Sequence, residues 1–299
     1  MLNIGIHAGS GRVDNYINLV KQNVNYKLSG IYDHAKDQKL KKSFRKDTSY
    51  DQFLADCDCI IFTNYSKNHY DQLVKAVKES KHIFFDSLEQ FEFFETQELM
   101  KLSHEANVVF AIGIKNSYFN SIKSSYNYFD NPILVEAKIS GINRNKDIIL
   151  NGSFVEFLFQ ILNVIRGNIK RVTAKNVSVE NEYPDISNIN LEFDNGCVVN
   201  FSLNRIIRKV KTELSFYKHH SYAIINISKK LIRIKTASRR NAKKIKFLNS
   251  ATSIKLDLLE MYNAIQNSTS VPFSIDYAVK ALEIVNKIRE KVRVTSNEM

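Results

Sequence analysis

The 299-residue sequence contains no apolar run that approaches the ~18 residues needed to cross a membrane. Its N-terminus begins directly as a strand, without the basic region, apolar core and cleavage site of a secretory leader. Also absent are a phosphate loop ending in Gly-Lys-Ser or Gly-Lys-Thr and the turn that carries a nucleophilic serine. We therefore expect a soluble, cytoplasmic protein with neither a phosphate-loop site nor a serine-hydrolase site.

Cysteine is also scarce, with three residues in the chain. Cys57 and Cys59 stand beside an apolar strand and form no metal-ligand or disulfide pattern. His219 and His220 lie in a basic region and have no His, Cys or carboxylate at ligand spacing. The sequence therefore predicts free thiols and no metal site.

Negative charge is nearly missing from residues 205–246, where Glu213 is the single acid among fourteen Lys and Arg residues. The net charge of this segment is therefore +13. Because the whole chain carries +12, the rest of the chain carries about −1. The alternation in "KKLIRIK" is typical of a solvated strand face. The alternative is a surface for anionic sugars, nucleotides or nucleic acid, and the sequence leaves both open.

What the sequence does have, up to about residue 115, is a regular alternation of short apolar strands with helices. This pattern indicates a parallel sheet that is covered on both faces. We predict an α/β, doubly wound parallel Rossmann domain over residues 1–118, of the kind that binds a dinucleotide. The expected strands are 2–8, 27–33, 59–63, 82–85 and 107–113, and the expected helices are 16–22, 38–43, 50–55, 68–80 and 89–106.

After residue 130 the pattern changes and strands dominate. Asp194-Asn195-Gly196, between two alternating runs, is a strong hairpin signal, and Ser274 is a plausible cap for the last of two closing helices. We predict that residues 119–299 form an α+β domain with a large, open, mostly antiparallel sheet. An apolar helix is expected at 152–165, and strands at 133–142, 170–180, 188–193, 197–204, 213–217, 222–228 and 231–236.

The first strand-to-helix turn, "AGSGRVDNY", matches part of a dinucleotide-binding loop. Such a loop needs glycines at i, i+2 and i+5 so that the backbone can approach the pyrophosphate. Gly9 and Gly11 fit, but Asp14 takes the third place, so the turn is either a degenerate dinucleotide loop or a plain glycine turn. Arg12 could contact phosphate, and Asp33 is correctly spaced to bond a ribose 2′-hydroxyl, although an Asp after a strand is also a common helix cap.

Two later stretches, "DCDCIIFTNY" and "SKNHYDQLVKAVKESKHIFFDS", resemble a region of the Gfo/Idh/MocA oxidoreductases, the glucose-fructose oxidoreductase and inositol dehydrogenase family. In that family the region runs from a Thr-Pro-Asn-x-x-His turn through a helix to a Glu-Lys-Pro strand end. The spacing from His69 to Asp86 agrees without a gap. "RGNIKRVTA", "LEFDNGCVVNFS" and "VPFSIDYAVKALEIVNKI" look like the second-domain strands and closing helix of the family. The resemblance covers nearly the whole chain.

The resemblance implies a nicotinamide cofactor, NAD or NADP, with Asp33 favouring NAD. It also implies a sugar or sugar-nucleotide substrate and a homodimer that pairs the second-domain sheets. The like charges of "KKLIRIK" oppose that pairing across a symmetric interface. The cofactor-binding residues that it implies are Gly9, Ser10, Gly11, Arg12, Asp33, Thr63, Asn64, His69 and Asp86.

The catalytic positions of the family are not retained. Its lysine falls on Ser87, its histidine on Phe157 and its aspartate on Gln160, and none of these three can exchange a proton at neutral pH. A positioned base contributes about 10²- to 10⁴-fold to such a reaction. We interpret the strand end at Asp86 and Ser87 as a helix cap, with Glu89 or Gln90 completing a capping box. Substitute proton donors would be Tyr65, His69, Lys115 and Tyr118.

Two main hypotheses follow. The chain is either an NAD(P)-dependent oxidoreductase with an atypical active site that acts on a sugar or sugar nucleotide, or a noncatalytic pseudoenzyme that serves as a binding or assembly subunit. A third hypothesis assigns a polyanion, nucleic acid included, to residues 205–246.

Overall fold

A computed structural model describes residues 1–8, 13–33, 46–47, 49–63, 69–86, 92–113, 130–141, 152–165, 167–178, 184–238, 240–247 and 250–296. The chain divides into two compact units, Met1–Asn116 with Asn249–Val279, and Ser117–Leu248 with Lys280–Met299. The predicted division at residue 118 placed 249–279 in the second domain, whereas these residues belong to the first unit. The reason is apolar packing, since the helix they contain contributes to the core of that unit.

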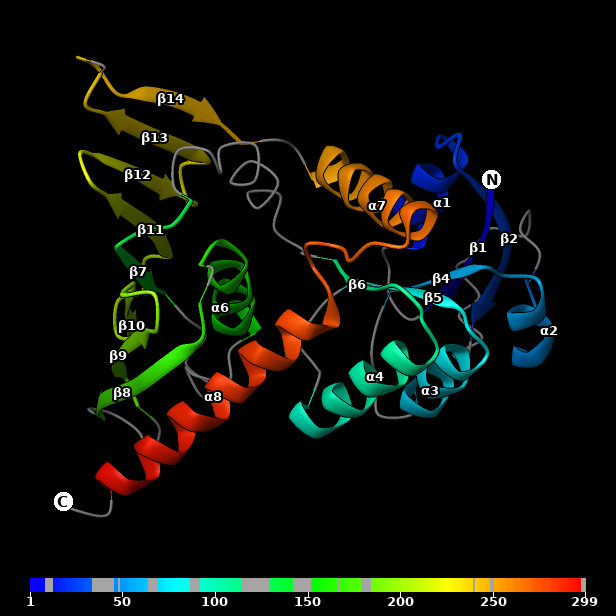
Figure 1. Cartoon of the computed structure of the whole chain (residues 1–299), viewed down its shortest axis with the longest axis horizontal. Helices are drawn as coiled ribbons and strands as arrows, with labels where there is room; N and C mark the ends of the chain where they lie inside the picture. Colours follow the sequence, from blue (N-terminus) through cyan, green and yellow to red (C-terminus); the bar gives the residue numbers. More distant parts are fainter. Residues whose placement is uncertain are drawn as a thin grey trace. The chain divides into compact units, whose positions relative to one another are not determined.

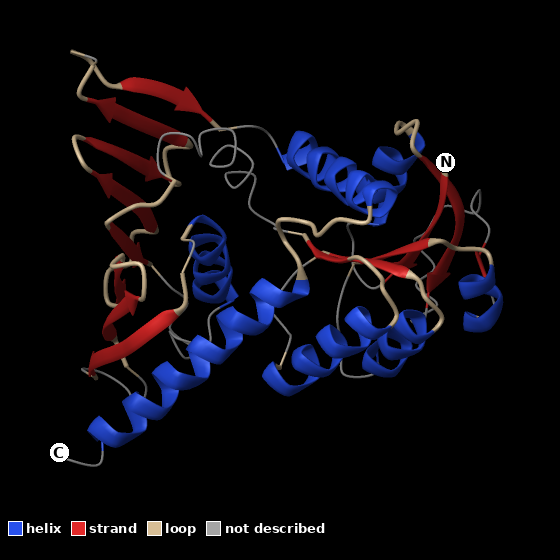
Figure 2. Cartoon of the chain, in the orientation of Figure 1, coloured by secondary structure: helices blue, strands red, loops and turns tan. Residues whose placement is uncertain are grey.

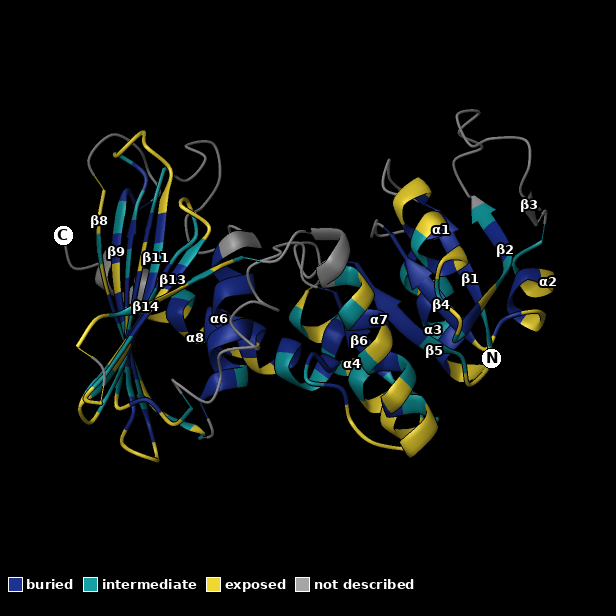
Figure 3. Ribbon diagram, turned by 90° about the horizontal axis from the view of Figure 1, so that it is seen from above, coloured by how far each residue is buried: buried dark blue, intermediate teal, exposed yellow. Residues whose placement is uncertain are grey.

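The first unit contains a six-stranded sheet in which every strand pair is parallel. The strand order is β3-β2-β1-β4-β5-β6, so the sheet grows to one side of β1 and then to the other (Figure 1). Several strands are buried along most of their length, as expected for a parallel sheet covered on both faces (Figure 3). The strands are β1 (Leu2–Ala8), β2 (Tyr26–Asp33), β3 (Lys46–Asp47), β4 (Cys59–Phe62), β5 (His82–Phe85) and β6 (Phe110–Ile112).

Helices cover both faces of this sheet (Figure 2). On one face, Ile4, Ile6 and Ala8 of β1 pack with α1 and with Leu258 and Met261 of α7. On the other, Gly5 leaves room for a close helix, because a Cβ there would lie 2.6 Å from the ring of Phe53. The helices are α1 (Val13–Lys21), α2 (Tyr50–Ala55), α3 (Tyr70–Lys78), α4 (Phe93–Glu105), α7 (Ser250–Asn267) and the first turns of α8 (Ile275–Ser296).

The second unit contains an eight-stranded sheet in the order β14-β13-β12-β11-β7-β10-β9-β8. All its pairs are antiparallel except β7 with β10. One face is apolar and packs against α6 (Gly152–Val164), where Phe154 meets Phe201 of β10 at 5.1 Å between ring centroids. The strands are β7 (Leu134–Ser140), β8 (Ile169–Val177), β9 (Ile186–Phe193), β10 (Val198–Asn204), β11 (Lys211–Lys218), β12 (Ser221–Asn226), β13 (Leu231–Thr236) and β14 (Lys243–Lys246).

The predicted fold class is confirmed: a doubly wound parallel sheet is followed by a large, mostly antiparallel sheet. The hairpin at Asp194-Asn195-Gly196 joins β9 to β10, with Gly196 in the left-handed region at φ +84°. Strands β3 and β14 were not predicted, because "KD" and "KKIK" have too little apolar alternation to stand out. The helix expected at 38–43 lies outside the described residues.

In the described part of the chain, no helix is both long enough and apolar enough to span a membrane.

Candidate functional site

The order of the strands in the six-stranded sheet reverses at β1. Strand β1 pairs with β2 on one side and with β4 on the other, and the chain builds the two halves of the sheet outward from this point. In open α/β sheets, ligands bind outside the carboxyl ends of the strands at such a reversal. The candidate site therefore lies where β1 and β4 end, at Ala8 and Phe62.

The predicted cofactor residues fall around this edge. Helix α1 begins at Val13, directly after the glycine turn, so the turn leads into a helix N-terminus. The backbone of Asp33 is in register with Ala8 at the end of β2, next to the strand that precedes the turn. Thr63 follows β4, is buried, and donates both its backbone N–H and its hydroxyl to the carbonyl of His7, at 3.2 and 3.3 Å. The structure thus brings Asp33 and Thr63 to the two sides of β1.

Several predicted positions lie outside the described residues. These are the loop residues Gly9, Ser10, Gly11 and Arg12, the turn residues Asn64 and Tyr65, the strand-end residue Ser87, and the two substitute donors Lys115 and Tyr118.

Asp86 is placed at the end of β5, where its side chain is 4% exposed. Its carboxylate accepts a hydrogen bond from the hydroxyl of Tyr16, a buried residue of α1. Helix α4 begins at Phe93 with Glu92 as its N-cap, so the prediction that Asp86 or Ser87 caps this helix is wrong. A buried carboxylate needs hydrogen-bond donors, and the hydroxyl of Tyr16 in the first helix is one of them for Asp86. Its structural effect is to hold α1 against the end of β5.

His69 is buried beside His7, with the two ring centroids 4.8 Å apart and the rings inclined at 69°. His7 is completely buried in β1 and stacks on Phe62 of β4 at 4.6 Å between centroids. His69 therefore packs on the face of the sheet that α2 and α3 cover, close to the carboxyl ends of the strands. No sequence pattern links these two histidines, because 61 residues lie between them and periodicity alone does not place them on one face.

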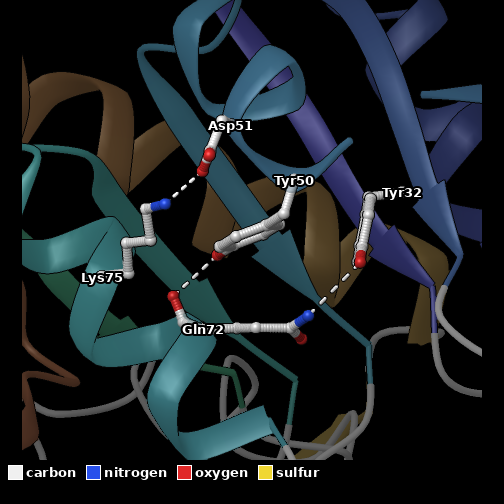
Figure 4. A network of polar contacts seen from close by, with 5 residues as sticks. All are labelled: Tyr32, Tyr50, Asp51, Gln72 and Lys75. Carbon is white, nitrogen blue, oxygen red and sulfur yellow. Dashed lines mark hydrogen bonds and ion pairs between the residues drawn. The ribbon is translucent and has the colours of Figure 1, made fainter. Parts of the chain in front are cut away.

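Gln72 of α3 is the polar centre of the same face (Figure 4). Its Oε1 lies 2.8 Å from Nε2 of His7, and its amide nitrogen lies 3.5 Å from the hydroxyl of Tyr32. Its main-chain carbonyl accepts a hydrogen bond of 2.7 Å from Tyr50. Burial raises the pKa of Tyr50 above its ordinary value, so this hydroxyl remains a neutral donor. The network joins β1, β2, α2 and α3 behind the candidate site, and an ion pair between Asp51 and Lys75 links the two helices nearby.

In the second unit, the positions that correspond to the histidine and aspartate of the family lie on α6. Phe157 and Gln160 are both buried there. Sequence reasoning missed a third residue, Glu156, whose side chain is 3% exposed. Glu156 and Gln160 are four residues apart and so share one face of the helix. The signal was available in "FVEFLFQIL", because a carboxylate inside an otherwise apolar helix is costly to bury without a purpose.

Within the described ranges, no three His, Cys, Asp or Glu side chains come together in a group that could hold a metal ion.

Replacing Tyr16 with Phe should lower the free energy of unfolding by about 1.5–3 kcal/mol, because the buried Asp86 carboxylate loses a donor. Urea denaturation followed by circular dichroism measures this. The matched control is Tyr26→Phe, which removes a buried bond of 2.8 Å to the neutral carbonyl of Leu258 and should cost only about 0.5–1.5 kcal/mol. Equal losses in the two variants would contradict a charged acceptor at Asp86.

No model of a known protein family matches the sequence, and no curated protein matches it. Solved structures do match. UDP-N-acetylglucosamine 3-dehydrogenase GnnA from Acidithiobacillus ferrooxidans superposes with a TM-score of 0.78 at 17% identity, covering 97% of each chain. The dehydrogenase MviM from Clostridium difficile gives a TM-score of 0.80 at 14% identity, covering 97% of this chain and 99% of its own. An NAD-binding protein from Listeria innocua gives 0.72 at 17% identity, covering 98% and 95%.

These matches extend over both units, at identities at which only the fold is shared. The resemblance to the Gfo/Idh/MocA oxidoreductases is confirmed at this level, and the chain has the two-domain fold of these dehydrogenases.

Proposed function

We propose that this chain is an NAD(P)-dependent oxidoreductase that binds its cofactor at the carboxyl edge of the six-stranded sheet and acts on a sugar or sugar nucleotide. The observation that carries the proposal is the strand order 3-2-1-4-5-6, all parallel, which is the order of dinucleotide-binding sheets. The substrate class is supported by a structural neighbour that is named as a UDP-N-acetylglucosamine dehydrogenase.

The roles of the residues follow from the position of the strand reversal. The pyrophosphate would bind at the N-terminus of α1, where backbone N–H groups and the helix dipole favour an anion, and Gly9 and Gly11 would allow its close approach. Asp33 ends the neighbouring strand, and its carboxylate would accept hydrogen bonds from the ribose. The 2′-phosphate of NADP would meet the same charge, so NAD is the favoured cofactor.

NADH should bind with a dissociation constant in the micromolar range, and Asp33→Ala should weaken its binding by about 10- to 150-fold, because a hydrogen bond to a charged group contributes about 1.5–3 kcal/mol. NADPH binding should stay the same or become tighter, because its 2′-phosphate no longer meets the Asp33 carboxylate. Titration calorimetry and the fluorescence of the reduced nicotinamide measure both. Asp51→Ala is the control, since Asp51 pairs with Lys75 on α3 and should leave cofactor affinity unchanged. If neither cofactor binds to the unmodified chain, the proposal fails.

A second candidate function, a noncatalytic binding or assembly subunit, is supported by the same helix α6. Phe157 stands where the family has its proton-transferring histidine, and neither Phe157 nor Gln160 can replace it. We propose that, if the chain turns over substrate, the buried carboxyl group of Glu156 takes part in proton transfer. A proton-transferring carboxyl group distinguishes the two functions, because a subunit that only binds its ligand has no need of one.

The Glu156→Gln variant should lower substrate-dependent oxidation of NADH by about 10²- to 10⁴-fold, the usual contribution of a general acid or base. Its affinity for NADH should stay the same, which also shows that the variant is folded. The control is Glu136→Gln in β7, a carboxylate that bonds the hydroxyl of Tyr217 at 3.0 Å. Full cofactor binding without turnover of any keto-sugar nucleotide by the unmodified chain would favour the noncatalytic subunit. Unchanged turnover in Glu156→Gln would exclude a role for this carboxyl group.

We also propose a homodimer that forms through the middle of the open face of the eight-stranded sheet, at β7, β10 and β9, and that leaves β13 and β14 uncovered. The middle of this face is rich in amides, with Asn190 and Asn200 joined by a hydrogen bond of 2.7 Å, and it holds a hollow of about 290 Å³ between Lys138 and Lys175. Across a two-fold axis, the same patch of both subunits meets itself. Neutral amides can pair there without the repulsion that like charges would cause.

Light scattering coupled to size-exclusion chromatography should give about twice the chain mass of 34.5 kDa. Asn200→Arg places a charge in the middle of this face and should shift the population toward the monomer, whereas Lys229→Ala, in a turn beyond the sheet centre, should not. A monomer at micromolar concentration in the unmodified chain would contradict the dimer.

A further inference from the structure

Some cations of the basic segment 205–246 have structural roles. Arg205 is buried, and its Nε donates a hydrogen bond of 2.6 Å to Asp185. Lys218 forms an ion pair of 2.7 Å with Asp130. Acidic residues outside the segment neutralise these two cations, so no anionic ligand is needed to explain their positions.

The cations on the last two strands of the sheet are arranged differently. Strands β13 and β14 form one edge of the eight-stranded sheet (Figure 1), and their register sets Arg233 opposite Lys244 and Leu231 opposite Lys246. Ile232 and Ile234 are buried on the other face. Arg233, Lys244 and Lys246 are therefore exposed together on the open face, and we call these three residues the basic face.

The basic face works against the stability of the sheet. Like charges directly opposite one another on adjacent strands are destabilising. No acidic residue occurs in β12, β13 or β14 to offset them. Lysines on an edge strand are common because they prevent pairing with another sheet, which would account for Lys244 and Lys246. Edge protection does not account for Arg233, because this residue lies on β13, the second strand from the edge, where no cation is required to prevent pairing.

We infer that the basic face binds the phosphates of a single-stranded nucleic acid. Residues i and i+2 of a strand lie about 6.6 Å apart and adjacent strands about 4.8 Å apart, so the three cations form a compact group on a flat surface, where they can contact successive phosphates. The same face carries an aromatic ring. Tyr222 of β12 is 37% exposed and lies opposite Lys235 of β13. An exposed tyrosine close to a group of cations is the combination that stacks a base and holds the backbone next to it.

The test uses the full chain and a fluorescein-labelled single-stranded oligonucleotide of mixed sequence, with binding followed by fluorescence anisotropy. The double variant Arg233→Gln/Lys244→Gln should weaken binding at least tenfold. It should also reduce the slope of log K against log salt by about 1.4, since each phosphate contact to a single strand contributes about 0.7. Because the substitution removes a like-charge pair, the urea midpoint should stay the same or rise. A loss of binding together with a gain of stability cannot come from misfolding.

Two further variants complete the test. Lys170→Gln/Arg171→Gln removes two exposed cations from β8, at the opposite edge of the sheet, and should leave binding unchanged. Tyr222→Ala should weaken binding about 5- to 150-fold, the range found for the loss of a base-stacking ring. A binding constant independent of salt would overturn the inference. So would equal affinity for heparin combined with no effect of Tyr222→Ala, which would show attraction to any polyanion by charge alone.

Discussion

The first unit depends on the requirement that a parallel sheet be buried on both faces. Its strands are joined through helices, and this connection brings every carboxyl end to the same edge. Ala8, Thr63 and Asp86 reach that edge from three different strands for this reason. The hydrogen bond between Tyr16 and Asp86 then fixes α1 against the end of β5. This buried contact holds in place the helix at whose N-terminus we propose that the pyrophosphate binds.

The two faces of the central strand show how packing and polarity are divided. Ile4 and Ile6 supply an apolar face to α1 and α7, while His7 turns toward α2 and α3. There the packing is partly polar, because Gln72 joins His7 and Tyr32, and its carbonyl receives the hydroxyl of Tyr50. Hydrogen bonds between particular side chains specify one arrangement more strictly than apolar contacts do. The network therefore fixes how β1, β2, α2 and α3 pack behind the strand ends.

This chain shares the fold of its structural neighbours, whereas the catalytic positions that the family resemblance implies hold Phe157 and Gln160. Its structural neighbours share the fold at 14–17% identity, because a fold requires only buried positions and turn residues of the right kind. Catalysis requires particular groups at particular points, and Phe157 and Gln160 do not supply them. Glu156, buried one position before Phe157, is the group in α6 that could restore acid–base chemistry. The fold therefore supports the proposed cofactor site more directly than it supports a particular reaction.

The two-part architecture, most strand and helix positions and the hairpin at Asp194-Asn195-Gly196 could be predicted from the amino-acid sequence, because these depend on local periodicity and turn chemistry. The sequence also located the edge at which Asp33 and Thr63 would stand. The long-range partners became known from the folded chain alone: Tyr16 for Asp86, 70 residues away, and Lys244 for Arg233. The folded chain likewise showed that α7 belongs to the first unit. Long-range pairing follows from how apolar faces fill space together, and no local pattern in the chain records which faces will meet.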